Sequence, residues 1–382
     1  MMKLRLFTPG PTMVSPDTLL EMAYPLDHHR TAGFREMFKE CTELLGYVFQ
    51  TKAKPLILTG SGTAAMEGAI LGCCKPDSLT LVCHSGKFGE RWAKILKRFK
   101  LPHVEYTQEY GRGFKAAGVA EQFKKHANIK AVIFVHSETS TCALSDAEGI
   151  ADVCRENGAL SLVDGITSIG TIPFKMDAWG IDLGVTGSQK ALMLPPGLGF
   201  AAVSERAWKV IESHEAPAFY NDLKAYRKTQ ADDDVPWTPN NQLVKGLRQT
   251  LRQIKAEGIE NIWDRSALMA RATRAACQAL GLSLYAVDPA DSVTGINVPA
   301  GVNDEQWRKS MRGKHGVHVA VGQGELKGKM IRINHMGYVD AVDTAGAIAA
   351  MEWTLAEQEY KFQIGSGAAA FVRAVAGIMD SR

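Results

Sequence analysis

A single lysine stands in an otherwise uncharged stretch of small and apolar residues. Lys190 follows the apolar run Leu183–Gly187 and precedes the chain-breaking segment Pro195–Gly197. An amine in apolar surroundings loses part of its charged form and becomes a better nucleophile. Such a lysine suits Schiff-base chemistry, although a surface lysine after a strand is the commoner explanation for one residue taken alone.

A carboxylate lies at the end of another predicted strand. Asp164 closes the apolar run Leu160–Asp164, and a carboxylate in such a place can pair with the pyridinium nitrogen of pyridoxal phosphate. Phe88, Thr139 and Lys190 also fall at or just after the ends of predicted strands. Because ligands of a parallel sheet bind beyond the carboxyl ends of its strands, these four residues are predicted to share one site.

A glycine-rich turn between a predicted strand and a predicted helix could hold an anion. The segment 55–67 contains Ser61, Gly62 and Thr63 at this turn. Backbone N–H groups at a helix N-terminus bind phosphate where small residues allow close approach. Neither the Walker pattern nor the dinucleotide glycine pattern fits, because no Gly-Lys-Ser/Thr follows and Ala65 replaces the third glycine. The turn therefore suits a single phosphate, or it is an ordinary strand-to-helix turn.

Apolar runs alternate with helical stretches over the first 215 residues. This alternation predicts an α/β fold with a mainly parallel sheet covered by helices on both faces. The predicted strands are Leu79–His84, Ala131–His136, Leu160–Asp164, Leu183–Gly187 and Gly199–Ser204, and the predicted helices cover 88–99, 117–127, 146–157 and 205–213.

The chain is expected to divide into three parts. We predict an extended N-terminal arm over residues 1–20, a large domain over 21–255 and a small C-terminal domain over 256–382. Prolines near the start argue against a helix before about residue 16. The predicted helix 241–257 is long enough to link the two domains, and the tail to Arg382 has no informative pattern.

An arginine lies in the middle of a late predicted strand. The run Met330–Gly337 contains Arg332. A buried or half-buried arginine is costly unless it meets a carboxylate, which its planar fork can bind with two hydrogen bonds. The carboxylate belongs either to the protein, in a structural salt bridge, or to a substrate.

In combination, these segments resemble a known family. Val163-Asp164-Gly165, Ser188-Gln189-Lys190, Pro195-Pro196-Gly197 and the run from Arg332 to Gly337 look like class V aminotransferases of pyridoxal phosphate fold type I. The branch most similar in appearance is the serine/alanine–pyruvate/glyoxylate aminotransferases, which includes proteins labelled as a soluble hydrogenase subunit. The resemblance extends from Phe7 to Arg332. It implies a large domain with a mainly parallel seven-stranded sheet between helices, and a smaller α+β C-terminal domain.

The resemblance also implies a cofactor, pyridoxal 5'-phosphate, and roles for single residues. Lys190 would carry the cofactor as a Schiff base and move the substrate's proton, Asp164 would keep the pyridine nitrogen protonated, and Arg332 would bind the substrate's carboxylate. The other implied contacts are Ser61, Gly62, Thr63 and a neighbouring subunit's Thr238 for the phosphate, Phe88, Thr139 and Gln189 for the ring region, and Gly10 with His29 for the substrate. The site is therefore expected to be shared within a homodimer.

The implied reaction is transfer of an amino group from a small L-amino acid, alanine or serine, to glyoxylate or pyruvate. A desulfurase or lyase on the same fold stays open, although Cys142 and Cys154 lie outside glycine-rich loops; relatives usually have glycine where Cys142 stands. The missing glycine pattern argues against a nucleotide-dependent dehydrogenase. A non-catalytic subunit is disfavoured because Asp164, Lys190 and Arg332 occur together.

Composition limits the remaining classes. The chain has 382 residues and a net charge of +3, too small to indicate nucleic acid binding. No apolar run is long enough for a membrane span, and the N-terminus reaches Pro9 too soon for a signal peptide. Seven cysteines without a CxxC pair indicate reduced thiols in a cytoplasmic enzyme. No metal is expected, because the adjacent His28 and His29 should point apart and lack acidic or cysteine partners.

Overall fold

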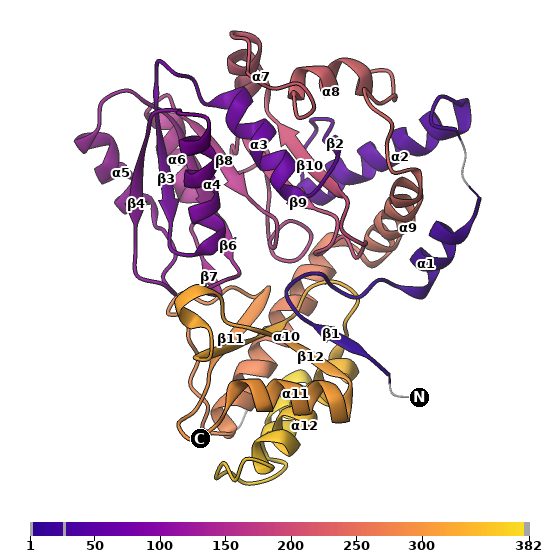
Figure 1. Cartoon of the computed structure of the whole chain (residues 1–382), viewed down its shortest axis with the longest axis vertical. Coiled ribbons are helices and arrows are strands. Elements are labelled where there is room, and N and C mark those ends of the chain that lie inside the picture. Colours follow the sequence, from indigo (N-terminus) through magenta and orange to yellow (C-terminus); the bar gives the residue numbers. More distant parts are fainter. Residues whose placement is uncertain (1–2, 26–27, 378–382) are drawn as a thin grey trace.

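The computed structural model describes residues 3–25 and 28–377, and Figure 1 shows a large domain above a smaller one. The strands of the large sheet are β2 (Leu56–Thr59), β3 (Leu79–His84), β4 (His103–Thr107), β5 (Ile129–Val135), β8 (Leu160–Asp164), β9 (Leu183–Gly187) and β10 (Leu198–Val203). Their order is β2-β10-β9-β8-β5-β3-β4. The strand β10 runs antiparallel to both of its neighbours, β2 and β9, and the other neighbouring strands of this sheet pair in parallel. The predicted α/β fold with a mainly parallel seven-stranded sheet is thus confirmed.

Helices cover both faces of this sheet. One face packs on α3 (Gly62–Cys73), α4 (Lys87–Arg98), α7 (Glu205–Glu212) and α8 (Leu223–Gln230), and the other on α2 (Ala32–Phe49), α5 (Ala116–Lys125), α6 (Ala147–Glu156) and α9 (Asn241–Glu257). Every residue of β8, β9 and β10 is consequently buried, which explains their almost unbroken apolar sequences. Most of these helices begin at a Ser, Thr, Asp or Asn whose side chain accepts a backbone N–H.

The small domain has its own four-stranded sheet. Its strands are β1 (Arg5–Phe7), β11 (Val293–Asn297), β12 (Val317–Val321) and β13 (Met330–Asn334), in the order β1-β12-β13-β11. The helices α11 (Asp304–His315), α12 (Ala341–Ala356) and α13 (Ser366–Val375) pack around it, and the turn η1 covers Gly324–Leu326.

The start of the chain differs from the expected extended arm. Arg5–Phe7 pairs in parallel with Val317–Val319, and Phe7 is fully buried in the small-domain core. The helix α1 (Pro16–Ala23) then packs against α9 of the large domain. The pairing strand lies more than three hundred residues away, so no local pattern could indicate it. The division at residues 20 and 255 stays a prediction.

The link between the domains also differs from expectation. The helix α9 packs within the large domain against α1 and α2. The following helix, α10 (Ile259–Ala279), begins in the large-domain core at Ile259 and ends in the small-domain core at Cys277. The helix α10, which is longer than α9, therefore connects the two domains. The length of a helix in the sequence does not reveal which hydrophobic cores its two ends enter.

Two expectations concerned membranes and the paired histidines. Within residues 3–25 and 28–377, no helix is long and apolar enough to cross a membrane. The expectation that His28 and His29 point apart is wrong, because their rings stack with centroids 4.7 Å apart. Both histidines lie just before α2 and outside any helix or strand.

Candidate active site

Lys190 lies in the turn that follows β9, and its side chain is only 8% exposed. Its Nζ donates a hydrogen bond to the carbonyl of Pro9 at 2.5 Å. Burial is the main reason that the pKa of this amine falls to about 8; the nearby Arg332 lowers it further, and Asp164 opposes the shift. The expected apolar setting of Lys190 is therefore present, and Asp164 and Arg332 lie within electrostatic reach of its amine.

The N-terminal segment is fastened over the lysine turn. The backbone N–H of Thr12 donates to the carbonyl of Gln189 at 3.0 Å, and its hydroxyl donates to the carbonyl of Lys190 at 2.7 Å. A Cβ on Gly10, whose φ is +125°, would overlap the Lys190 side chain. Only glycine fits at this position, which agrees with the predicted place of Gly10 beside the site.

Asp164 is 2% exposed at the end of β8. Its Oδ2 accepts a hydrogen bond from Trp92 Nε1 at 2.9 Å, and its Oδ1 accepts one from the backbone N–H of Ile166 at 3.0 Å. Burial raises the pKa of the carboxyl, and these hydrogen bonds oppose the shift. Trp92 was not among the predicted site residues, although it stands one helical turn after Phe88 in α4.

Phe88 lies in the first turn of α4, and its ring centroid is 6.0 Å from Lys190 Nζ. The guanidinium of Arg91 lies 5.1 Å from the same centroid. Arg91 also donates a hydrogen bond to the hydroxyl of Thr63 at 3.2 Å. A second cation, not singled out from the sequence, thus joins the ring position to the predicted anion turn.

The predicted anion turn begins α3. Ser61 is the N-cap residue, and its hydroxyl accepts a hydrogen bond from the backbone N–H of Thr63 at 3.3 Å. The N-terminus of a helix favours negative charge, and Arg91 adds a full positive charge beside it. Gln189 lies close by, since a Cβ on Gly187 would be 3.1 Å from its Oε1 and 3.4 Å from the backbone nitrogen of Gly62.

Arg332 lies in the middle of β13 and is 4% exposed. Its guanidinium donates to the carbonyl of Thr139 at 2.7 Å and to the carbonyl of Val321 at 2.8 and 3.2 Å. No carboxylate of the described residues lies within salt-bridge distance of it, which excludes the structural salt bridge in this part of the chain. Burial lowers the pKa of Arg332, and the nearby Cys142 and Glu138 oppose the shift without pairing with the guanidinium directly.

Two predicted residues lie away from this group. Thr238 is exposed on the segment that precedes α9. His29 packs edge-to-face with Phe34 at the start of α2, with ring centroids 6.4 Å apart. Within the described residues, neither residue shares a hydrogen bond with Lys190.

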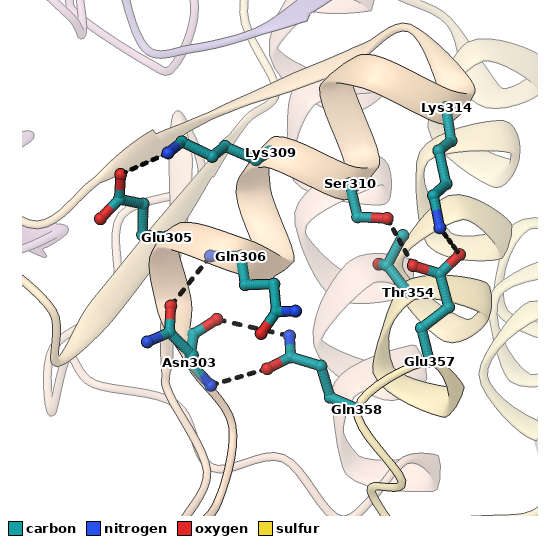
Figure 2. A pocket seen from close by; sticks show the side chains of 9 residues that line it. All are labelled: Asn303, Glu305, Gln306, Lys309, Ser310, Lys314, Thr354, Glu357 and Gln358. Carbon is teal, nitrogen blue, oxygen red and sulfur yellow. Dashed lines mark hydrogen bonds and ion pairs between the residues drawn. The ribbon is translucent and has the colours of Figure 1, made fainter.

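The small domain holds a further polar hollow, shown in Figure 2. Residues of α11 and of the end of α12 line it, and their side chains bind one another. Lys309 pairs with Glu305 at 2.7 Å, and Lys314 pairs with Glu357 at 3.0 Å. No residue lining it belongs to the group around Lys190.

Pyridoxal phosphate fits the residues that surround Lys190. The amine has a lowered pKa, the Oε1 of Gln189 is buried without a hydrogen-bond partner, and the missing side chain of Gly10 makes room for Lys190 itself. An aromatic ring, a buried carboxylate and a helix N-terminus complete a set that matches the ring, the pyridine nitrogen and the phosphate of this cofactor. The fold and site together define a pyridoxal-phosphate-dependent transaminase of fold type I.

Comparisons with known proteins agree with this class. The family model for aminotransferase class-V matches residues 23–369. The "Soluble hydrogenase 42 kDa subunit" of Anabaena cylindrica is 38% identical over 97% of this chain and 98% of the relative, and the "Serine--glyoxylate aminotransferase" of Methylorubrum extorquens is 34% identical over 96% and 94%. The crystal structure of pyridoxamine-pyruvate aminotransferase from Mesorhizobium loti superposes with a TM-score of 0.94, at 26% identity, over 99% of this chain and 98% of that one. The chain belongs to the class-V aminotransferase family.

Proposed function

We propose that this transaminase moves an amino group from a small L-amino acid, alanine or serine, to glyoxylate or pyruvate. One observation carries the proposal. A nucleophilic amine and a buried guanidinium without a carboxylate partner lie close enough for the charge of Arg332 to lower the pKa of Lys190. An amino acid brings both an amine and a carboxylate, and this pair of groups complements it.

Lys190, Arg332 and Asp164 have separate roles in the proposed reaction. Lys190 would hold the cofactor through its amine and would carry the proton at the substrate's alpha carbon. Arg332 would bind the alpha-carboxylate and fix the orientation of the bond that breaks. Asp164 would pair with the ring nitrogen and keep it protonated. When bound, pyridoxal phosphate supplies an aldehyde that condenses with amines and a ring that accepts electrons.

The remaining contacts hold the cofactor in place. We assign the phosphate to the turn of Ser61, Gly62 and Thr63, the face of the ring to Phe88, and polar contacts near the ring to Thr139 and Gln189. Gly10 leaves room for the substrate. These assignments rest on the positions of the residues around Lys190 and on the family resemblance.

The balance of charge supports a substrate with one carboxylate. The cations whose charges affect Lys190 are Arg332 and Arg91. Arg91 already binds Thr63 at the anion turn, so of these two described cations Arg332 is left for the substrate. Relatives named for serine and for aspartate are both known, and L-aspartate is therefore the competing donor in any test.

A cysteine desulfurase receives little support. All seven cysteines are buried and without disulfides. Burial raises the pKa of Cys142 to about 12 and raises that of Cys154 as well. Thiols of this kind stay protonated at neutral pH and are poor nucleophiles.

We also propose a cytoplasmic homodimer in which Thr238 reaches the phosphate of the neighbouring subunit. Thr238 is exposed beside Trp237, which packs against Phe219 at a centroid distance of 4.9 Å, and Phe219 is 78% exposed. Exposed aromatic groups of this kind mark protein interfaces. Light scattering during size-exclusion chromatography should give twice the chain mass of 41.6 kDa; the monomer mass would contradict the shared site.

The absorbance spectrum of the purified protein tests the reaction. With L-alanine or L-serine and no acceptor, the cofactor's band should convert to that of the pyridoxamine form and return when glyoxylate or pyruvate is added. Conversion by L-aspartate alone would replace the proposed donor. A band that no amino acid converts would indicate a lyase or a non-catalytic subunit.

A further inference from the structure

Glu138 is a buried carboxylate beside the site to which no role has yet been given. It lies in the short strand β6 (Ser137–Glu138), which pairs with β7 (Ala143–Leu144), and it is 2% exposed. Its Oε2 accepts the backbone N–H groups of Phe88 at 3.1 Å and Gly89 at 2.9 Å. Its Oε1 accepts the backbone N–H of Ser140 at 3.0 Å and the Ser140 hydroxyl at 2.5 Å.

These four hydrogen bonds join two segments that are distant in sequence. One is the first turn of α4, which carries Phe88. The other is the loop after β6, where the carbonyl of Thr139 accepts the hydrogen bond from Arg332. Ser140 strengthens the same joint, since its hydroxyl accepts the backbone N–H of Lys87 at 2.9 Å.

The first turn of α4 and the loop after β6 are closely packed where they meet. A Cβ on Gly86 would come within 2.5 Å of the Glu138 side chain and of the Ser140 hydroxyl. The carboxylate also lies at the N-terminus of α4, where negative charge is favoured. Both oxygens accept hydrogen bonds from donors only, as an ionised carboxylate can. Burial raises the pKa of this carboxyl, and the hydrogen bonds from Ser140 and Gly89 oppose the shift.

We propose that Glu138 is a positioning residue that sets the place of the Phe88 ring and the direction of Arg332 at the same time. The inference rests on the proposed function, because it takes Phe88 to face the cofactor ring and Arg332 to bind the substrate's carboxylate. Glu138 itself touches neither. It acts through the backbone N–H of Phe88 and through the loop that presents the carbonyl of Thr139.

Glu138→Gln tests this arrangement with almost no change in shape. The glutamine carries an NH₂ group in place of one acceptor oxygen, so at least one buried backbone N–H loses its partner. The expected result is a dissociation constant for pyridoxal phosphate raised about 10- to 100-fold, the range found when a residue that orients ligand-binding groups is replaced. The KM for the amino donor should rise at the same time. Ser140→Ala is a milder variant that removes only the hydroxyl, should it be needed to keep the chain folded.

Asp182→Asn supplies the matched control. Asp182 is also 2% exposed, and it accepts hydrogen bonds from the backbone N–H of Ser161 at 2.9 Å and from the Ser204 hydroxyl at 3.0 Å. It lies just before β9, whereas Lys190 follows the other end of that strand. The control should lower the melting temperature and leave cofactor affinity and KM unchanged.

Double variants distinguish positioning from general damage. If Glu138 acts through Phe88, its effect on cofactor affinity should largely vanish in a Phe88→Ala background; if it acts through Arg332, its effect on KM should shrink in an Arg332→Lys background. Additive effects in both backgrounds, or an unaltered Glu138→Gln protein, would overturn the proposal. The cofactor titration needs no turnover, so it still tests Glu138 if the proposed substrates turn out to be wrong.

Discussion

The site around Lys190 and the hollow of the small domain are both polar, yet they differ in what their charges do. In the hollow, Lys309 and Lys314 are 74% and 61% exposed, and each has a glutamate partner among the residues that line it. At the site, Lys190 and Arg332 are 8% and 4% exposed, and their hydrogen bonds go to backbone carbonyls.

This difference indicates which of the two places needs a ligand. Charges that pair with each other in water are satisfied without a ligand, and such pairs contribute little to stability. Buried cations without carboxylates are costly, and a ligand that brings negative charge removes part of the cost. Among the described residues, buried cations without carboxylate partners distinguish the active site from the surface hollow better than the size of a hollow does.

The largest effect should follow from Lys190→Ala. Without the amine, the cofactor has no attachment and the substrate's proton has no base, so transamination should fall by about 10⁴-fold or more, the upper range for loss of a general base. The absorbance band of the protein-bound cofactor should also disappear. Activity within tenfold of the unaltered enzyme would remove Lys190 from the mechanism.

Arg332→Gln should have the next largest effect. It removes the charge that meets the substrate's carboxylate, and a charge-assisted hydrogen bond is worth about 1.5–3 kcal/mol, or roughly 10- to 100-fold. Steady-state kinetics should place the loss mainly in KM for the amino donor. Arg332→Lys keeps a charge and should recover only part of it; full recovery would show that the two-pronged contact is unimportant.

The pH dependence of cofactor binding sharpens the contrast between a buried and an exposed lysine. The pKa of Lys190 is lowered to about 8, so its neutral, nucleophilic form grows about tenfold per pH unit below that value and levels off above it. Stopped-flow absorbance of the cofactor-free protein should show the association rate rise to a plateau above pH 8. A rate that keeps rising toward pH 10 would indicate an ordinary, solvated amine.

The smallest effect should come from the hollow. Lys314→Ala removes a pair whose partners are 61% and 35% exposed, which should change the free energy of unfolding by less than about 1 kcal/mol. Chemical denaturation measures the change, and transamination should stay as in the unaltered enzyme. A loss of activity would show that the hollow serves the reaction after all.

Much of this site follows from local sequence. Strands buried on both faces leave continuous apolar runs, so β3, β8 and β9 could be placed to the residue, and Asp164 and Lys190 with them. The glycine that the family resemblance implies at position 142 would suit the backbone there, since Cys142 has a φ of +61°.

Other parts depend on contacts that no local pattern contains. Trp92 and Arg91 are ordinary helix residues in the sequence, and only the packing of α4 against β3, β5 and α3 brings them to Asp164 and Thr63. Arg332 could be matched to a carboxylate by chemistry, but the carbonyl of Thr139 that holds it comes from the other domain. The place of Thr238 depends on a second chain and stays a prediction.

The strand β1 has a mechanical consequence. Because residues 5–7 belong to the small-domain sheet and α1 to the large domain, the polypeptide crosses between the domains once beside Lys190 and again along α10. Two covalent connections therefore restrain the small domain, and Arg332 with it, more than a single connection would.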